Sequence, residues 1–192
     1  SAAEPGGESR SRNIAVAIRV RPLSRAEQEQ PPQSTSTLVS EIGSLAWAVE
    51  PNSVHDLYSN DRWHFDHVFG PEVGTSEIFH ACVRDVLVSC CEGINGSILA
   101  YGQTASGKTY TMHGDGQLCG IVPESMVELF RLLKLRSERE ECKVSLAYLE
   151  IYNEQVVDLL EVEGAPEVKL RDGPDGQLRL SPLTVKAVST PA

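Results

Sequence analysis

The chain has 192 residues, of which 41% are hydrophobic and 23% charged, and its net charge at pH 7 is −10. This composition is typical of a globular domain and excludes a fibrous or intrinsically disordered chain. The acidic balance leaves no basic stripe of the kind that binds nucleic acid, and no apolar run is long enough to insert into a membrane.

The amino-terminal part of the chain shows mainly β-strand patterns. In residues 13–20, alternate apolar side chains share one face, which predicts a strand that ends at Arg21-Pro22. A Gly43-Ser44 pair predicts the turn of a hairpin. The elements expected here are a flexible arm over 1–12, a strand over 13–20, a hairpin over 38–50 and a strand over 62–69.

Helical patterns follow. Thr75 is the predicted N-cap of a helix that Gly93 ends, because its apolar residues keep helical spacing. Pro123 suits the first turn of a later helix. The elements expected in this part are a helix over 75–92, a short buried strand over 97–101, a helix from Lys108 that breaks within 113–120, and a helix over 122–135.

The remaining sequence is again rich in strand patterns. The expected elements are a long strand over 142–152, a helical turn over 155–160, and strands over 167–170 and 178–180 around a turn at 174–176. Because strands alternate with helices along the chain, we predict an α/β fold in which helices cover a sheet. Five cysteines without a C-x-x-C pair argue against zinc or disulfides and favour a reduced, cytoplasmic setting.

One segment carries a specific chemical signature. Residues 102–109, GQTASGKT, match the phosphate-binding pattern G-x-x-x-x-G-K-[ST] at every position, between a predicted strand and a predicted helix. Two glycines allow the backbone amides to approach an anion, a lysine reaches the β- and γ-phosphates, and a hydroxyl ligates Mg²⁺. The predicted phosphate-binding residues are Gly102, Gln103, Thr104, Ala105, Ser106, Gly107, Lys108 and Thr109, with Thr109 as the Mg²⁺ ligand.

Nucleotide hydrolysis needs further groups, including a carboxylate on the Mg²⁺ side. Asp158 follows two valines and is a weak candidate for that carboxylate, because its neighbours suit an amphipathic turn better. A small-molecule kinase or a GTPase is the alternative class of enzyme. The faintly lid-like stretch 131–143 suits a solvated helix end better, and the N-K-x-D base-reading motif of GTPases does not occur.

Four ordered motifs resemble those of kinesin motor domains. They are IRVRPL (18–23), FDHVFGPEVGTSEIF (65–79), AYGQTASGKTYTM (100–112) and YLEIYNEQVVDLL (148–160). The resemblance covers residues 13–190, and GINGSILAYGQTASGKTYTMHG is most similar to the centromere-associated and related plant kinesins. It implies a three-layer P-loop NTPase fold, with a central mixed sheet between two layers of helices.

The resemblance also implies ligands, partners and a location. Kinesins bind ATP·Mg²⁺ and microtubules, so it implies an ATPase motor of the cytoplasmic cytoskeleton. At the base end of the site it implies that Arg19, Arg21 and Pro22 line the adenine and that Tyr110 covers its other side. An aromatic ring and a proline can hold a purine between them while an arginine stacks on it or contacts its edge.

This sequence lacks two motifs of the family. Neither N-x-x-S-S-R-S-H nor D-x-x-G-x-E, the two switch motifs, occurs in the 192 residues. We therefore expect the amino-terminal part of a motor domain over 13–192, a fold incomplete on its carboxyl-terminal side, and no complete catalytic set. Residues 167–188 resemble a secondary tubulin-contacting lobe. Two functions stay open at this point: part of a microtubule-stimulated ATPase, or a fragment that binds nucleotide without hydrolysing it.

Overall fold

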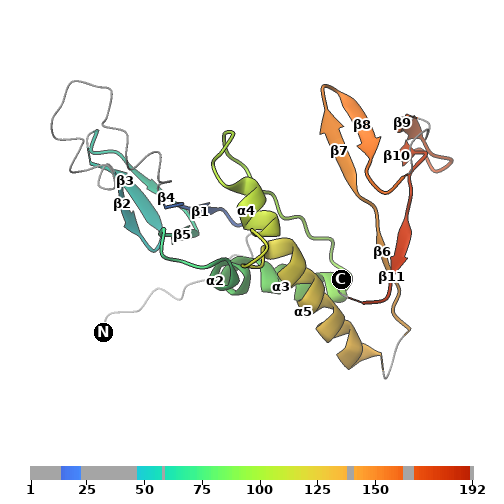
Figure 1. Ribbon diagram of the computed structural model, residues 1–192, viewed down its shortest axis with the longest axis horizontal. Coiled ribbons are helices and arrows are strands. Elements are labelled where there is room, and N and C mark those ends of the chain that lie inside the picture. Colours follow the sequence, from blue (N-terminus) through green and yellow to red (C-terminus); the bar gives the residue numbers. More distant parts are fainter. Residues whose placement is uncertain (1–13, 23–46, 58, 138–140, 162–166, 191–192) are drawn as a thin grey trace, which may run out of the picture. The chain divides into compact units, whose positions relative to one another are not determined.

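The computed structural model describes residues 14–22, 47–57, 59–137, 141–161 and 167–190 (Figure 1). The predicted arm over 1–12 and the turn at Gly43-Ser44 lie outside these residues. The chain divides into two compact units, Ser1–Ser125 and Met126–Ala192. Both strands and helices are present, so the chain is a mixed α/β fragment, as its sequence predicts.

The first unit contains most of the helices. Its strands are β1 (Ala17–Arg19), β2 (Trp47–Glu50), β3 (Ser53–Asp56), β4 (Arg62–His64) and β5 (His67–Phe69). Its helices are α2 (Thr75–Ile78), the π-helix η1 (Phe79–Val83), α3 (Arg84–Cys91) and α4 (Lys108–His113), and α5 (Ile121–Arg136) begins in this unit and continues into the second.

Strand pairing gives two sheets in the first unit. β1 pairs in parallel with β5, from Ala17 opposite His67 to Arg19 opposite Phe69. β2, β3 and β4 form an antiparallel sheet of three strands, in which Val54 lies opposite both Val49 and Trp63. The parallel pair positions the site, because the carboxyl end of β1 carries Arg19 toward the start of α4.

The second unit contains three antiparallel pairs of strands. Its strands are β6 (Val144–Leu146), β7 (Leu149–Tyr152), β8 (Gln155–Asp158), β9 (Lys169–Asp172), β10 (Leu178–Ser181) and β11 (Lys186–Val188). β7 pairs with β8, β9 with β10, and β6 with β11. The described strands of the whole chain therefore form five small sheets of two or three strands each.

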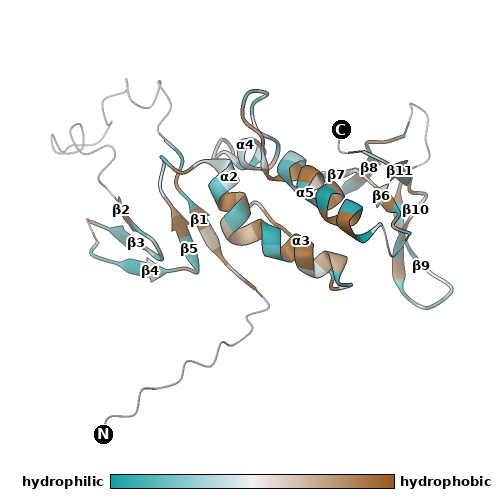
Figure 2. Cartoon of the chain, turned by 90° about the horizontal axis from the view of Figure 1, so that it is seen from below, coloured by the Kyte–Doolittle hydropathy of each residue, from teal (hydrophilic) through white to brown (hydrophobic). Residues whose placement is uncertain are grey.

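The apolar core of the first unit holds the helices together. Ile78, Phe79, Val83 and Ile121 are buried, and partly buried residues that include Ile98 and Met112 pack against them. Burying a side chain of this kind stabilises a fold by about 1.5–3 kcal/mol. Met112 belongs to α4, so this core anchors the helix that follows the glycine-rich loop. In Figure 2, α3 and α5 each carry apolar and polar residues, as partly covered helices do.

The helix predictions are confirmed in most respects. The helix expected over 75–92 ends at Gly93, whose φ of 94° is left-handed, and five of its residues form the π-helix η1. Gly74 is its N-cap, and Thr75 is its first helical residue instead of its cap. The break expected within 113–120 and the helix expected over 122–135 are both present. No helix of the described residues is long and apolar enough to cross a membrane.

Two predictions of a single long strand were wrong, because the chain changes partners midway. Residues 62–69 divide into β4 and β5 where the amide of Phe65 donates to Asn52 O and that of Asp66 donates to Val16 O. Residues 142–152 divide into β6, which pairs with β11, and β7, which pairs with β8. The strand predicted over 13–20 is regular over Ala17–Arg19.

Two other segments differ in type from their prediction. Residues 97–101 were expected to be a short buried strand, but they join no ladder with a described strand, and all of them except Ile98 are exposed. Residues 155–160 were expected to form a helical turn, but the first four are β8. The cause is the turn at Asn153 and Glu154, whose φ angles of 46° and 63° bring Gln155 opposite Tyr152. The two tail strands are confirmed as β9 and β10.

Candidate nucleotide-binding site

The glycine-rich loop lies between residues 97–101 and α4. Within it the amide of Ser106 donates a hydrogen bond to Gln103 O at 3.2 Å, which closes a tight turn. Ala105 and Gly107 both have left-handed backbones, with φ of 64° and 99°. Gly107 is the N-cap of α4 and no side chain caps that end, so the first amides of the helix have no capping acceptor.

Both glycines of the motif are required by the geometry of the loop. A Cβ added to Gly102 would lie 2.5 Å from Ser106 Oγ, which is closer than real contacts allow. A side chain on Gly107 would be strained because of its positive φ. Glycine at 107 therefore lets the chain make this turn without strain, and glycine at 102 leaves room for the Ser106 side chain.

Lys108 supplies the positive charge of the site. Its Nζ donates hydrogen bonds to Gly102 O and Gln103 O, each at 2.8 Å, so the ammonium lies over the carbonyls at the beginning of the loop. The neighbouring Thr109 is exposed on the first turn of α4. An ammonium of three donors, backbone amides and a hydroxyl together form a set of groups that suits a triphosphate with its Mg²⁺.

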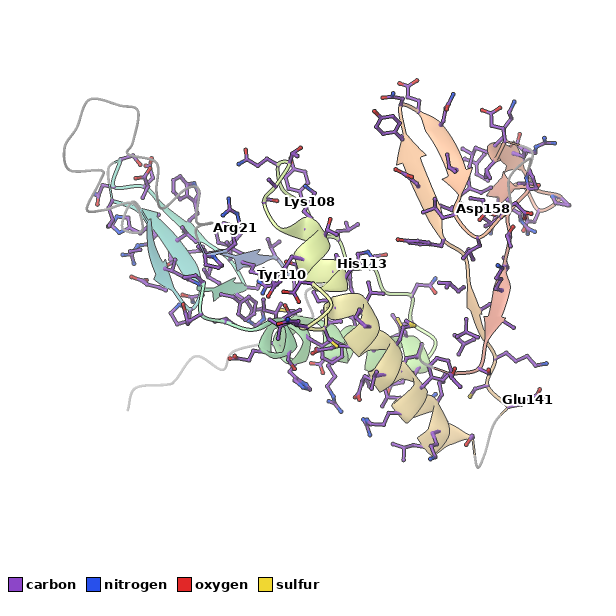
Figure 3. All side chains as sticks on the ribbon, in the orientation of Figure 1. Arg21, Lys108, Tyr110, His113, Glu141 and Asp158 are labelled. Carbon is purple, nitrogen blue, oxygen red and sulfur yellow. The ribbon has the colours of Figure 1, made fainter. Side chains whose placement is uncertain are left out.

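The R-x-R-P segment reaches the same loop from the end of β1. The guanidinium of Arg19 lies over the ring of Tyr110, with 5.2 Å from Cζ to the ring centroid. Arg19 Nη1 also donates to Thr111 Oγ1 at 3.0 Å. Arg21 Cδ lies 3.9 Å from the position of a Cβ on Gly107. Figure 3 shows Arg21, Lys108 and Tyr110 around the start of α4.

The predicted site residues are therefore in the same part of the first unit. The structure places the loop beside Arg19, Arg21 and Tyr110. Pro22 follows Arg21, and Arg21 Nη1 donates to the carbonyl of Pro22 at 3.1 Å. Thr111 is a contact that sequence reasoning missed. The phosphate-binding pattern ends at Thr109 and does not include Thr111. Thr111 contacts Arg19 on β1, which is 92 positions away in sequence, so no local pattern indicates this contact.

Asp158, the weak candidate for a Mg²⁺-side carboxylate, has a different role. Its Oδ2 accepts from the amide of Thr184 at 2.6 Å and its Oδ1 from that of Leu160 at 3.0 Å, all within the second unit. These hydrogen bonds, first that from Thr184, lower the pKa of the Asp158 carboxyl. No cluster of three or more metal-ligating side chains occurs among the described residues. The geometry supports a structural use of Asp158.

Comparison with known proteins identifies the family. The family model of the kinesin motor domain matches residues 19–192. The chain belongs to the kinesin motor domain family. The resemblance to this family is thus confirmed, and the family implies a P-loop NTPase-like fold.

Several kinesin-like proteins are similar over most of the chain. Kinesin-like protein KIN-7G of rice is 36% identical over 177 residues, which are 92% of this chain and 18% of that protein. Human centromere-associated protein E is 34% identical over 147 residues, covering 77% of this chain and 5% of its own length. Chicken kinesin-like protein KIF18B is 34% identical over 172 residues, which cover 84% of this chain and 21% of that protein.

These relatives agree with the predicted subgroup, since both a KIN-7 kinesin and centromere-associated protein E are among them. The chain spans less than a quarter of the length of each of these three relatives. What the similarity establishes for this chain is therefore the kinesin motor domain family.

Proposed function

We propose that this chain is the ATP-binding part of a microtubule-based kinesin motor, and that the intact protein hydrolyses ATP to act on microtubules. The observation that carries the proposal is the loop at 102–109. It matches the phosphate-binding pattern at every position, it has a left-handed Gly107, and it holds the Lys108 ammonium on its carbonyls. We further propose that residues 13–192 take the three-layer arrangement of the family, with a central mixed sheet.

Each group has a defined task in this proposal. The amides of the loop and the Lys108 ammonium bind the β- and γ-phosphates, because charge-assisted hydrogen bonds are about twice as strong as neutral ones. Thr109 ligates Mg²⁺, which would screen the charge of the phosphates when bound. Arg19, Arg21, Pro22 and Tyr110 hold the adenine. Because Arg19 lies directly over the Tyr110 ring at 5.2 Å, the base stacks outside this pair and not between its two members.

The second candidate function is nucleotide binding without turnover. It is favoured by a sequence observation: the two switch motifs, which in kinesins sense the γ-phosphate, occur nowhere in the 192 residues. We propose that this chain by itself binds ATP with little or no hydrolysis. Phosphate release from the purified 192-residue chain, if it depended on Lys108, would contradict this part of the proposal.

The proposed partner is the microtubule, and the proposed location is the cytoplasmic cytoskeleton. A net charge of −10 is unfavourable for contact with an acidic surface such as tubulin. The β9–β10 hairpin carries a group of basic residues, of which Lys169 pairs with Glu167 and Arg179 with Asp175. Its register places Arg171 opposite Arg179 and Lys169 opposite Ser181, so three basic residues share one face. We propose this face as the contact of the 167–188 lobe with tubulin.

The function is tested by replacing Lys108 with Ala in the intact protein. We expect microtubule-stimulated phosphate release to fall by at least a hundredfold, since the ammonium that neutralises the transferred phosphate is lost. Lys134→Ala, the same change on an exposed residue of α5, is the matched control and should keep wild-type activity. Undiminished hydrolysis by Lys108→Ala would remove the proposed mechanism.

A further inference from the structure

Thr111 connects the two elements that carry the base end of the site. It follows Tyr110 directly on α4, and its Oγ1 accepts the hydrogen bond that Arg19 Nη1 donates at 3.0 Å from the last residue of β1. The same guanidinium lies over the Tyr110 ring. One arginine therefore contacts two consecutive residues of the helix, one through a hydrogen bond and one through its planar face.

These two contacts together fix the orientation of the guanidinium. A cation above an aromatic ring can slide and rotate, since the attraction to the ring has no directional donor and acceptor. A hydrogen bond from a guanidinium is directional, and a charged donor makes it stronger than a neutral one. Arg19 and Thr111 are both half-buried, so solvent competes less for this hydrogen bond than for one at the surface.

The Tyr110 ring keeps an accessible face in this arrangement. Tyr110 is 37% exposed although the guanidinium lies over one face of its ring. A flat base can stack either on the open face of the ring or on the outer face of the guanidinium. The hydrogen bond to Thr111 holds the guanidinium surface in place. A purine, with two fused rings, covers more of either surface than a pyrimidine does.

We propose that Thr111 is a positioning residue that sets the base selectivity of the site. Its hydroxyl holds Arg19, and Arg19 holds the Tyr110 ring in the orientation that accepts a purine. The inference rests on the proposed nucleotide-binding function and deepens it. It assigns Thr111 no contact with the phosphates, and the role of its Oγ1 is to accept from Arg19.

The test is competition binding on the intact protein with a fluorescent ATP analogue, with ATP, CTP and inorganic tripolyphosphate as competitors in the presence of Mg²⁺. Thr111→Val keeps the shape of the side chain and removes the acceptor. We expect it to weaken ATP binding about five- to tenfold, from the loss of one charge-assisted hydrogen bond. Tripolyphosphate binding should stay within about twofold, and the preference for ATP over CTP should shrink.

Two further variants separate positioning from a merely structural role. Thr111→Ser restores the hydroxyl and should restore both affinity and base preference. Arg19→Lys keeps the charge but loses the planar fork, so it should reproduce the base-specific loss. In steady-state kinetics, Thr111→Val should raise KM for ATP with little change in kcat, because the base takes no part in phosphoryl transfer. Thermal unfolding of each variant reports whether it folds, and Thr111→Ala, which also removes the acceptor, carries the test if Thr111→Val does not.

The outcomes are distinct. Equal loss of ATP and tripolyphosphate binding in folded Thr111→Val, or no loss of either in that variant, would overturn the positioning role and leave the proposed function intact. A wild-type protein that binds none of the three competitors would overturn the proposed function itself. Base-specific loss with rescue by Thr111→Ser is the result that supports the inference.

Discussion

At the scale of single residues, several residues other than glycine have left-handed backbone conformations. Asn60, Ala105, Asn153 and Glu154 have positive φ angles among the described residues. For an L-residue this conformation costs about 1–2 kcal/mol, although asparagine tolerates it better than most. Ala105 lies in the glycine-rich loop, where such strain can serve binding. Glu154 lies in an exposed hairpin turn, where a less strained residue can replace it.

Glu154→Gly should therefore stabilise the second unit. The turn between β7 and β8 has positive φ at both of its central residues, which is the conformation of a type I′ turn, and Asn-Gly is the preferred pair for it. Relief of strain exceeds the entropy cost of glycine, so we expect a gain of about 0.5–1 kcal/mol. Chemical denaturation followed by circular dichroism measures this gain.

Glu150→Gly is the matched control on the same hairpin. Glu150 is an exposed residue of β7 opposite Val157, where glycine weakens a strand. This control should lose about 0.5–1 kcal/mol. If both variants lost stability by the same amount, the left-handed strain at Glu154 would be of no consequence for folding.

The residue scale also shows what a sequence can and cannot indicate about a site. Gly102 and Gly107 were predictable from the spacing of the motif, and the left-handed φ of Gly107 is a torsion that favours glycine. Lys108 and Thr109 were predictable because they follow the second glycine at a fixed spacing. The left-handed Ala105 and the role of Thr111 were not, because each depends on contacts or torsions that alanine and threonine do not signal.

At the scale of elements, Asp158 joins parts of the second unit that are far apart in sequence. Its carboxylate ends β8 and accepts from the amide of Thr184, which lies between β10 and β11. Thr184 Oγ1 in turn donates to a carboxylate oxygen of Glu161. The isolated bridge between Val156 and Val168 adds a second link between β8 and the start of β9. Two hairpins are thus held together by a few polar contacts.

These contacts make the stability of the second unit sensitive to acid. Hydrogen bonds to the ionised carboxylate lower the pKa of Asp158 below its ordinary value of about 3.9. The folded state then binds fewer protons than the unfolded state, so the free energy of unfolding rises with pH in this range. The contribution is complete above the unfolded pKa and is lost as pH falls through the folded pKa.

Asp158→Asn should therefore reduce the difference in stability between pH 7 and pH 3. Urea denaturation at the two pH values measures the free energy of unfolding. The variant should lose most of its stability relative to the wild type at pH 7. Asp172→Asn makes the same change on an exposed residue of β9 and controls for net charge. An unchanged pH dependence in Asp158→Asn would show that the hydrogen bond to Thr184 contributes nothing to folding.

The same scale explains where element prediction succeeded. Helices were predicted well because their spacing, caps and stops are local, as at Gly93 and Pro123. Strands were predicted less well because a strand is defined by its partner. Residues 62–69 and 142–152 have continuous strand patterns, but each divides where hydrogen bonding passes to another segment. β8 was missed because the turn before it uses Asn153 and Glu154, without the glycine that usually marks such a turn.

At the scale of the whole molecule, the α/β class was predictable from the alternation of patterns, and the arrangement of the strands was not. The described strands form five small sheets, and their pairing was not indicated by the sequence. Which strands pair is decided by contacts far apart in sequence, as between β1 and β5 or β6 and β11. The segment at 97–101 has a strand-like sequence but joins none of the described sheets. Its backbone is therefore available to pair with another chain.

Leu99→Glu should make the 192-residue chain more monomeric. Leu99 and Tyr101 are 90% and 101% exposed in an extended segment whose backbone joins no described ladder, which is the combination that drives strand association. We expect the wild type to self-associate at roughly micromolar concentrations in sedimentation velocity. Because the net charge of −10 opposes this, association should increase with salt. Leu135→Glu, at a 66% exposed position of α5, should leave self-association unchanged, and a wild type monomeric at all concentrations and salts would contradict the prediction.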